Sequence, residues 1–280
     1  MKIKVTTSND EIRRLVSNAK EKGQTVGLVP TMGALHQGHL SLVQEANKKA
    51  DFTVASIFVN PTQFDDNSDL ENYPRSLDAD IHMLKEVNCN AVYVPSSDEV
   101  YKDSKPFEFD FNGLNKPMEG EYRAGHFQGV VQVVKRLFEI INPDLACFGL
   151  KDFQQYAIIK EMVNQLNIPI DVIGCETIRE ENGLAMSSRN QLLAREDLQS
   201  ALLISKALRL IQQNYRKHSP AELKALAVEP LQKEINLEYL EIADSDRLQP
   251  IESWSEAKHA RAFIAAKVGE VRLIDNMEIF

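Results

Sequence analysis

Short apolar runs separated by amphipathic segments dominate the first 175 residues. Each run has the length of a buried strand, and the segments between the runs repeat apolar residues at helical spacing. Strands are expected at residues 2–6, 25–29, 52–59, 91–94, 144–148 and 168–173. Apolar strands that alternate with helices are typical of a parallel sheet covered on both faces. The pattern therefore predicts an α/β domain with a Rossmann-like parallel sheet over residues 1–175.

Three details refine this domain. Pro30 follows the run at residues 25–29, and because proline has no N–H for a sheet, we expect the strand to end there. Phe107, Phe109 and Phe111 alternate with polar or charged residues, which predicts a half-exposed strand. The turn-rich stretch 62–74 is expected to be a loop.

The pattern changes near Cys175, after which the polar stretch 177–190 contains the turn sequence Glu-Asn-Gly. Helical spacing returns at residues 196–215 and again from Pro220. Three strand-like runs follow at residues 238–243, 261–267 and 271–274. We therefore expect a smaller α+β domain over residues 176–280 that closes over the first domain as a lid.

Composition and charge narrow the class of protein. The 280 residues are 43% hydrophobic and 26% charged, which is ordinary for a soluble globular protein. The net charge of −9 argues against nucleic acid or an anionic membrane as the main partner. The N-terminus lacks the apolar segment of a signal peptide, and no apolar run is long enough to span a membrane. Cys89, Cys147 and Cys175 lie in scattered apolar contexts, so we expect reduced cysteines and a cytoplasmic location.

The most informative stretch is 25–42, TVGLVPTMGALHQGHLSL, where an apolar strand gives way to an amphipathic helix. His36 and His39 stand at the start of that helix, and Gly38 between them lets a ligand approach the backbone closely. Free N–H groups and the helix dipole favour an anion such as phosphate at this corner. A single histidine there is more often a cap or a surface residue, so the pair carries the interpretation. Zinc is disfavoured because no further ligands follow at metal spacing.

Two other turns place cations beside groups that bind phosphate. The chain reads Gly149-Leu150-Lys151-Asp152 after the run at 144–148, so a lysine stands where the helix dipole favours an anion. A ligand phosphate explains this lysine, and a solvated lysine beside a capping aspartate explains it equally well. Residues 186–189, Met-Ser-Ser-Arg, suit a phosphate clamp, although such a sequence is usually an exposed loop. Ligands of parallel sheets bind at the carboxyl ends of strands, so the site walls are expected after strands 25–29, 52–59 and 144–148.

Neither a P-loop, nor a dinucleotide-binding glycine motif, nor a Gly-x-Ser-x-Gly elbow occurs in the sequence. The His-x-Gly-His and Met-Ser-Ser-Arg sequences instead resemble the two signatures of the adenylate-forming nucleotidyltransferase superfamily, which includes the class I aminoacyl-tRNA synthetases. Longer blocks resemble the pantothenate synthetase family, the pantoate–β-alanine ligases. These blocks are PTMGALHQGHLSL (30–42), FVNPTQF (58–64), YPR (73–75), RAGHF (123–127), FGLKDFQQ (148–155) and GLAMSSRN (183–190). They keep the family's order, whereas the C-terminal domain matches in size and position more than in motif.

The resemblance implies a reaction in two steps, in pantothenate and coenzyme A biosynthesis. Pantoate and ATP would form an enzyme-bound pantoyl adenylate and pyrophosphate. β-Alanine would then attack the adenylate to give pantothenate and AMP. The resemblance also implies that Mg²⁺ accompanies ATP and that the protein is a homodimer.

The same resemblance implies roles for particular residues. His36, His39, Lys151 and Arg189 are expected to offset charge on the α-phosphate, with His39 as the proton donor. The expected ATP-binding residues are Met32, Gly33, Ala34, Leu35, His36, Gln37, Gly38, His39, Gly149, Leu150, Lys151, Asp152, Ile178, Met186, Ser187, Ser188 and Arg189. Gln63 and Gln155 are expected to hold pantoate, since amides both donate and accept hydrogen bonds. Considered without its block, Gln63 would be interpreted as an exposed loop residue. Asp80 is a candidate magnesium ligand, with a solvated carboxylate on a helix face as the alternative.

Five further residues have roles that the motifs leave open. Arg123 and His126 lie at a loop-to-helix corner and are candidates for assisting closure over substrate. Val133 and Val134 are expected either to face the geminal methyl groups of pantoate or to pack in the core. Leu150 departs from the polar or charged residue expected at its position in many relatives.

Two alternatives to the ligase stay open. A nucleotidyltransferase acting on a phosphorylated acceptor would use the same His-x-Gly-His corner, but it would need Arg or Lys in place of Gln63 and Gln155. A nucleotide sensor or a tRNA-binding relative of the synthetases fits poorly with the charge of −9 and with the presence of His39 and Lys151.

Overall fold

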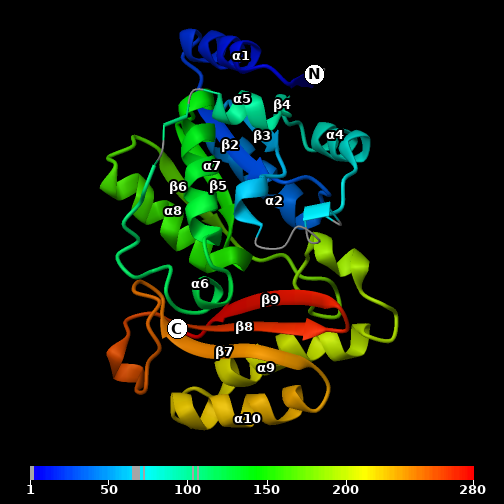
Figure 1. Ribbon diagram of the computed structural model, residues 1–280, viewed down its shortest axis with the longest axis vertical. Helices are drawn as coiled ribbons and strands as arrows, with labels where there is room; N and C mark the ends of the chain where they lie inside the picture. The colour runs from blue at the N-terminus through cyan, green and yellow to red at the C-terminus, as the bar shows by residue number, and fades with distance from the viewer. Residues whose placement is uncertain (1–2, 65–69, 72, 103, 106) are drawn as a thin grey trace. The chain divides into compact units, whose positions relative to one another are not determined.

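The computed structural model describes residues 3–64, 70–71, 73–102, 104–105 and 107–280 (Figure 1). The chain divides into two compact units. Unit 1 comprises Met1–Phe111, Arg123–Leu150 and Gln155–Glu176, and unit 2 comprises Asn112–Tyr122, Lys151–Gln154 and Thr177–Phe280. Two short segments from the N-terminal part of the sequence therefore belong to the C-terminal unit.

Unit 1 is built on a six-stranded parallel sheet, which confirms the Rossmann-like α/β prediction. The strand order is β1-β4-β3-β2-β5-β6. The strands are β1 (Lys4–Thr6), β2 (Val26–Thr31), β3 (Phe52–Ile57), β4 (Ala91–Tyr93), β5 (Leu145–Gly149) and β6 (Asp171–Cys175). β2, β3 and β5 are buried along most of their length, because helices cover both faces; this is why their sequences are continuously apolar.

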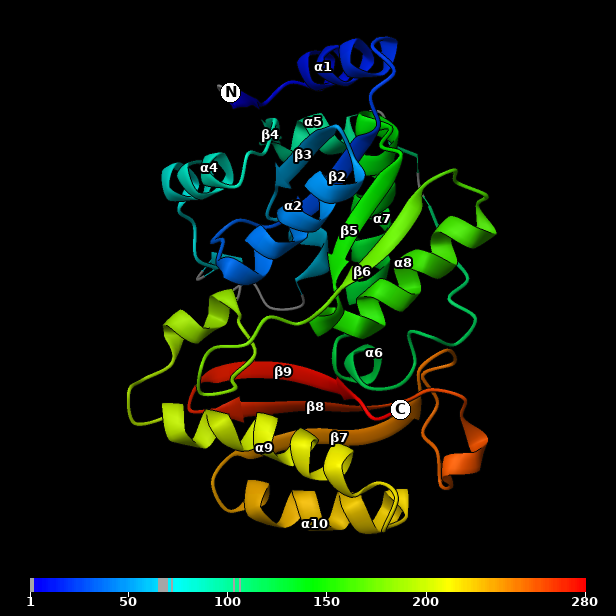
Figure 2. The same cartoon turned by 180° about the vertical axis from the view of Figure 1, so that it is seen from behind.

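Helices lie on both faces of this sheet. α2 (Gln37–Lys49) covers one face and α7 (His126–Ile141) the other, so α7 is in front in Figure 1 and α2 is in front in Figure 2. Leu40, Val43 and Ala46 of α2 pack with the sheet in one apolar core, which also contains all three cysteines. The cysteines are free and buried, as expected. The other helices of this part of the chain are α1 (Asn9–Glu21), α4 (Leu77–Glu86), α5 (Ser97–Tyr101) and α8 (Phe153–Gln165).

Two local predictions for this unit are wrong. β2 does not end before Pro30: it pairs with β3 through Thr31, while its pairing with β5 involves only Gly27 and Leu28. The N–H that proline lacks would face β5 beyond the end of that pairing, so the strand loses no hydrogen bond. Residues 107–111, all of them described, form no strand, and their rings pack on one another instead. The predicted loop at 62–74 lies partly outside the described residues.

The strand order reverses between β2 and β5. The chain continues from β2 to β3 on one side and later returns to β5 on the other. In open parallel sheets such a reversal creates a crevice at the carboxyl ends of the strands, where ligands bind. The turns after Thr31 and Gly149 stand at those ends, so the topology points to the same two turns as the motifs.

Unit 2 contains two long helices and three strands, as predicted, and the strands pair in an antiparallel sheet. The strands are β7 (Asn236–Asp244), β8 (Ala260–Val268) and β9 (Val271–Glu278), in that order. α9 (Leu198–Asn214) and α10 (Pro220–Gln232) pack on one side of this sheet around a shared apolar core (Figures 1 and 2). The unit also contains α6 (Glu119–Tyr122), η3 (Ser188–Leu192) and η4 (Trp254–Glu256). Within the described part of the chain, no helix is long and apolar enough to cross a membrane.

Candidate active site

The turn between β2 and α2 is tight, and a buried carboxylate stabilises it by accepting backbone N–H groups. Gly33 and Ala34 have positive φ values of 85° and 49°. Glycine adopts this conformation freely, whereas it costs an alanine roughly 1–2 kcal/mol. The Asp80 carboxylate on α4 compensates by accepting the N–H of Ala34 at 3.0 Å and the N–H of Leu35 at 2.8 Å. Ser76 Oγ donates to the same carboxylate at 3.2 Å.

These contacts correct the expectation for Asp80. Its side chain is not solvated on a helix face, because the residue is only 1% exposed. Both of its carboxylate oxygens accept backbone N–H groups. Among the described residues, no group of three or more His, Cys, Asp or Glu side chains could hold a metal. A lone buried carboxylate already bonded to backbone does not fit a resident magnesium site, which needs several oxygen ligands around an accessible position.

His36 and His39 cap the start of α2 reciprocally. His36 Nδ1 accepts the N–H of Gly38 at 3.1 Å, and His39 Nδ1 accepts the N–H of His36 at 3.3 Å. A backbone N–H can only donate, so both Nδ1 atoms are unprotonated and each neutral ring carries its proton on Nε2. The ring centroids are 4.1 Å apart. The structure therefore confirms a capping role for both histidines at the start of α2.

Gln63 lies where β3 leads into η1 (Pro61–Gln63), and it is buried rather than an exposed loop residue. Its side-chain amide donates to Met32 Sδ at 3.0 Å and accepts from Asn60 Nδ2 at 3.3 Å. The first contact joins the turn after β3 to the turn after β2. The structure therefore places Gln63 beside Met32, in the turn that leads to the His-x-Gly-His sequence, inside unit 1.

The start of α7 holds the backbone of Gln63. The Gln63 carbonyl accepts from His126 Nδ1 at 2.8 Å and from Arg123 Nη2 at 3.3 Å. His126 must therefore carry its proton on Nδ1, and its Nε2 accepts from Arg123 Nη1 at 3.1 Å. Gly129 permits the close approach, since a Cβ there would lie 2.3 Å from the carbonyl oxygen of Thr62. Arg123 and His126 thus position Gln63, a task that the motifs did not reveal.

Gly149 and Leu150 stand at the end of β5, where η2 (Leu150–Asp152) begins. Leu150 lies over β6, because a Cβ on Gly174 would be 2.7 Å from Leu150 Cδ2. This packing explains an apolar side chain where a polar one was expected. Gln155 is half-buried in the first turn of α8, while Val133 and Val134 are buried in α7.

The remaining predicted site residues belong to unit 2: Lys151, Asp152, Ile178, Met186, Ser187, Ser188 and Arg189. The N–H of Met186 donates to the carbonyl of Ile178 at 3.0 Å, so these two lie side by side. Ser187 is the N-cap of η3, and its Oγ accepts the N–H of Arg189 at 3.3 Å. The Ser-Ser-Arg sequence is therefore an ordered helix start.

A buried polar network in unit 2 escaped the sequence analysis. Arg272 donates to both Glu119 oxygens at 2.7 and 2.8 Å, and Tyr239 Oη donates to Glu119 Oε1 at 2.8 Å. Burial raises the pKa of Tyr239 well above its usual value, and the Glu119 carboxylate raises this pKa further. Gln154 Oε1 accepts the N–H of Glu119 at 3.1 Å. The network joins segments 112–122 and 151–154 to the C-terminal sheet, and of the residues named here only Gln154 lies in one of the sequence blocks.

Comparison with known proteins covers the whole chain. The family model of the pantoate-beta-alanine ligases matches residues 4–278. A pantothenate synthetase of Porphyromonas gingivalis strain W83 is 46% identical over 269 residues, which is 95% of this chain and 96% of that protein. The pantothenate synthetase of Bacteroides thetaiotaomicron is 42% identical over 278 residues, which is 99% of each chain.

Solved structures agree with the sequence comparison. A pantothenate synthetase from Thermus thermophilus matches with a TM-score of 0.93 at 37% identity, covering 99% of this chain and 100% of that one. A pantoate-beta-alanine ligase from Francisella tularensis, in complex with beta-gamma ATP and beta-alanine, matches with a TM-score of 0.83 at 33% identity. It covers 99% of this chain and 98% of that one. The likeness thus includes the C-terminal part, where sequence motifs were few. This chain belongs to the pantoate-beta-alanine ligase family.

Proposed function

We propose that this protein is a ligase that condenses pantoate with β-alanine at the expense of ATP. The products are pantothenate, AMP and pyrophosphate, formed through a pantoyl adenylate on the route to coenzyme A. The observation that carries the proposal is the family match over residues 4–278. The Francisella relative, solved with beta-gamma ATP and beta-alanine, supports the choice of substrates.

In the first step a carboxylate oxygen of pantoate attacks the α-phosphorus of ATP. The bond from that phosphorus to the oxygen bridging to the β-phosphate breaks, and pyrophosphate leaves. Negative charge grows on the phosphate oxygens during this step. We assign the offsetting groups to His36 and His39 and to the cations Lys151 and Arg189, with His39 as the proton donor.

In the second step the neutral amine of β-alanine attacks the acyl carbon of the adenylate. The bond from this carbon to the phosphate oxygen breaks, AMP leaves, and the new amide nitrogen releases a proton to solvent. Water competes with the amine for the adenylate, so the intermediate needs shielding. We assign nucleotide and pantoate binding to residues 1–175 and the lid function to residues 176–280.

The binding residues follow from the motifs and from local geometry. ATP is assigned to Met32–His39, Gly149–Asp152, Ile178 and Met186–Arg189. Pantoate is assigned to Gln63 and Gln155. The buried position of Gln63, beside Met32 and braced by Arg123 and His126, supports a fixed recognition group better than a mobile loop residue.

We further propose that Mg²⁺ enters as its complex with ATP and is held mainly by the phosphates. The absence of a multi-ligand cluster among the described residues supports this assignment over a resident metal. A homodimer and a cytoplasmic location complete the proposal. The resemblance to the family supports the first, and three free, buried cysteines support the second.

The test is an AMP-release assay with ATP, Mg²⁺ and pantoate, run with and without β-alanine. AMP release that requires both acids is the expected result. No AMP release with all substrates present would refute the proposal. Transfer of a nucleotidyl group to a phosphorylated acceptor would instead identify a nucleotidyltransferase and would remove Gln63 and Gln155 as pantoate ligands.

A further inference from the structure

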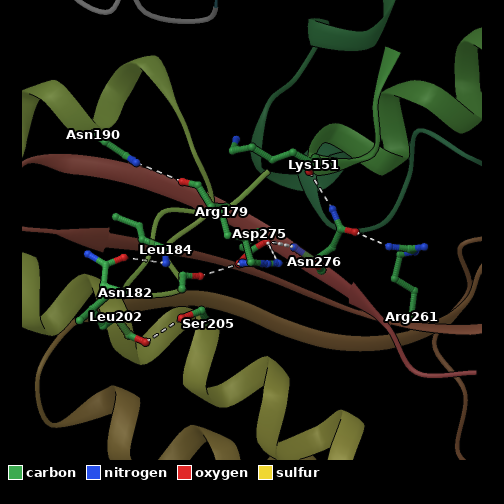
Figure 3. Close-up of polar contacts among 12 residues, drawn as sticks. Lys151, Arg179, Asn182, Leu184, Asn190, Leu202, Ser205, Arg261, Asp275 and Asn276 are labelled. Atoms are coloured by element: carbon green, nitrogen blue, oxygen red, sulfur yellow. Dashed lines mark hydrogen bonds and ion pairs between the residues drawn. The ribbon is translucent and has the colours of Figure 1, made fainter. Parts of the chain in front are cut away.

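β9 carries two adjacent polar residues, Asp275 and Asn276, that are buried to 4% and 3% exposure (Figure 3). Buried polar side chains need hydrogen-bond partners, and those partners reveal what the side chains hold in place. One partner of each residue lies outside the three-stranded sheet: Arg179 for Asp275 and the Lys151 carbonyl for Asn276. Lys151 is assigned to ATP by the proposed function, and Arg179 lies in the turn that precedes the assigned residues 186–189.

Asp275 holds the turn that leads into the Met-Ser-Ser-Arg sequence. Its carboxylate accepts two bonds from the guanidinium of Arg179, at 2.7 and 2.9 Å. Such a bidentate ion pair fixes the orientation of the guanidinium and the carboxylate as well as the distance between them. Arg179 Nη1 also donates to the carbonyl of Gly183 at 3.2 Å, which ties the far side of the same turn. The turn at 179–185 is therefore attached to β9 immediately before residues 186–189.

The other end of this sequence is held as well. Asn190 Nδ2 donates to the carbonyl of Ala185 and to Glu180 Oε1, both at 3.0 Å. Arg179 and Ala185 form a β-bridge within the turn. Residues 186–189 therefore lie between Ala185 and Asn190, which are hydrogen-bonded to each other. Ala185 belongs to the turn that the Arg179–Asp275 ion pair attaches to β9.

Asn276 holds the segment that carries Lys151. Asn276 Nδ2 donates to the carbonyl oxygen of Lys151 at 2.7 Å, and Asn276 Oδ1 accepts from Arg261 Nη1 at 2.7 Å. A guanidinium only donates and a carbonyl only accepts, so the amide has one permitted orientation. In Figure 3 the Lys151 side chain extends away from this contact, which leaves its ammonium group for another partner.

Arg261 braces the same segment a second time. Its guanidinium lies 4.2 Å from the centroid of the Phe153 ring, and the Phe263 ring packs against Phe153 at 5.9 Å. The β8–β9 register pairs Phe263 with Asn276 directly. The Lys151 backbone and the Phe153 ring therefore contact Asn276 and Phe263, which are paired neighbours in one sheet.

We propose that Asp275 and Asn276 are positioning residues that hold Lys151 and the Met186–Arg189 segment in a fixed spacing on one strand. Groups that stabilise a transition state must be placed to within about 0.5 Å, and adjacent residues of one paired strand provide such a constant spacing. The C-terminal sheet is then the template for the cations, in addition to its assigned role in the lid. The identity of what the cations bind rests on the proposed function.

Asn276→Asp is the sharpest test because it keeps the shape of the side chain. The new carboxylate still accepts from Arg261, but it presents an oxygen to the Lys151 carbonyl in place of a donor. In single-turnover adenylate formation from ATP and pantoate, we expect a rate about 10- to 100-fold lower, the effect of a small misplacement. The KM for pantoate should stay within about twofold, since Gln63 belongs to unit 1.

Two comparisons separate positioning from general damage. Glu278→Gln removes the negative charge from another Arg261 contact, at 2.9 Å, without touching Lys151, and it should keep the rate within about twofold. In a Lys151→Ala background, Asn276→Asp should lower the rate by no more than about twofold, because its effect passes through Lys151. Equal rate losses with and without Lys151, or a wild-type rate for Asn276→Asp, would overturn the proposal.

A second variant, Asp275→Asn, and a second measurement, hydrogen exchange, test the same positioning role independently of the Asn276→Asp rate. If Asn276→Asp does not fold, Asp275→Asn makes the same comparison for the other segment, with Arg189→Ala as its background. Hydrogen exchange of residues 150–155 should quicken in Asn276→Asp and not in Glu278→Gln, without any substrate. Unchanged exchange would reject the anchoring of Lys151. A wild-type protein that released no AMP would reject only the proposed function.

Discussion

Replacing Asp80 by asparagine probes the turn on which the histidine corner depends. The carboxylate accepts the N–H groups of Ala34 and Leu35, one on each oxygen, and Ala34 is held at a φ of 49°. Asparagine has nearly the same shape but only one acceptor oxygen. Its NH₂ group would therefore face one of the two backbone donors.

The magnitude follows from this mismatch. A buried N–H left without a partner costs about 1–3 kcal/mol, and the surviving bond loses its ionic character at a cost of about 1 kcal/mol. Relaxation of Ala34 from its positive φ recovers part of that loss, roughly 1 kcal/mol. We expect the free energy of unfolding to fall by about 1–3 kcal/mol. Because His36 follows Ala34 by two residues, the rate of adenylate formation should fall by about 10- to 100-fold.

Urea unfolding and single-turnover adenylate formation measure the two effects. Asp78→Asn is the matched control, since Asp78 lies on the same helix but is exposed. Raising the Mg²⁺ concentration distinguishes these backbone hydrogen bonds of Asp80 from metal binding. Excess Mg²⁺ would partly restore the rate if a metal ligand had been lost, but not if the hydrogen bonds to the turn had been lost. Wild-type stability together with a wild-type rate, or recovery of the rate with Mg²⁺, would refute the role of Asp80 in holding the turn.

The other predictions concern single groups. His39→Ala and Lys151→Ala should each lower the rate of pyrophosphate release in single turnover by about 10²-fold, the scale of one lost donor to a developing anion. Near-normal rates in both would contradict their assignment. Gln63→Ala should weaken pantoate binding by about 1–3 kcal/mol in calorimetry, and an unchanged affinity would count against the contact. Burial raises the pKa of the Cys89 thiol from 9.0 to about 12, so the folded state favours the neutral thiol. The corresponding stability is present below pH 9 and is lost as the pH rises from 9 to about 12. Urea unfolding at pH 8 and pH 11 should therefore show a smaller loss in Cys89→Ala than in the wild-type protein.

Much of the fold could be predicted from spacing along the chain. The parallel sheet, its helices and the strands of the C-terminal α+β part all follow from apolar periodicity, which depends on neighbours within a few residues. Pro30 was misjudged because its cost depends on whether a partner strand needs its N–H, and the strand order decides that. The Phe107–Phe111 alternation had the period of a strand, but mutual packing of the rings replaced strand pairing.

The candidate site likewise combines features that the sequence reveals with features that only tertiary contacts decide. His36 and His39 were visible because a histidine pair at a helix start is a local pattern. Their protonated nitrogen was not visible, because it depends on which backbone N–H each Nδ1 accepts. Asp80 was recognised as acidic, yet only the fold shows that it holds a turn 45 residues away along the chain.

The sequence by itself determined most of the elements, the family and the residue types that can handle phosphate. Only the tertiary structure decided which polar groups hold which others. Asn276 and Lys151 are 125 residues apart, and Glu119 and Arg272 are 153 apart. Local patterns reflect the repeat of one helix or strand, so they carry no information on such pairs. A buried polar side chain acquires its partner only when distant segments pack together and exclude the water that would otherwise satisfy it.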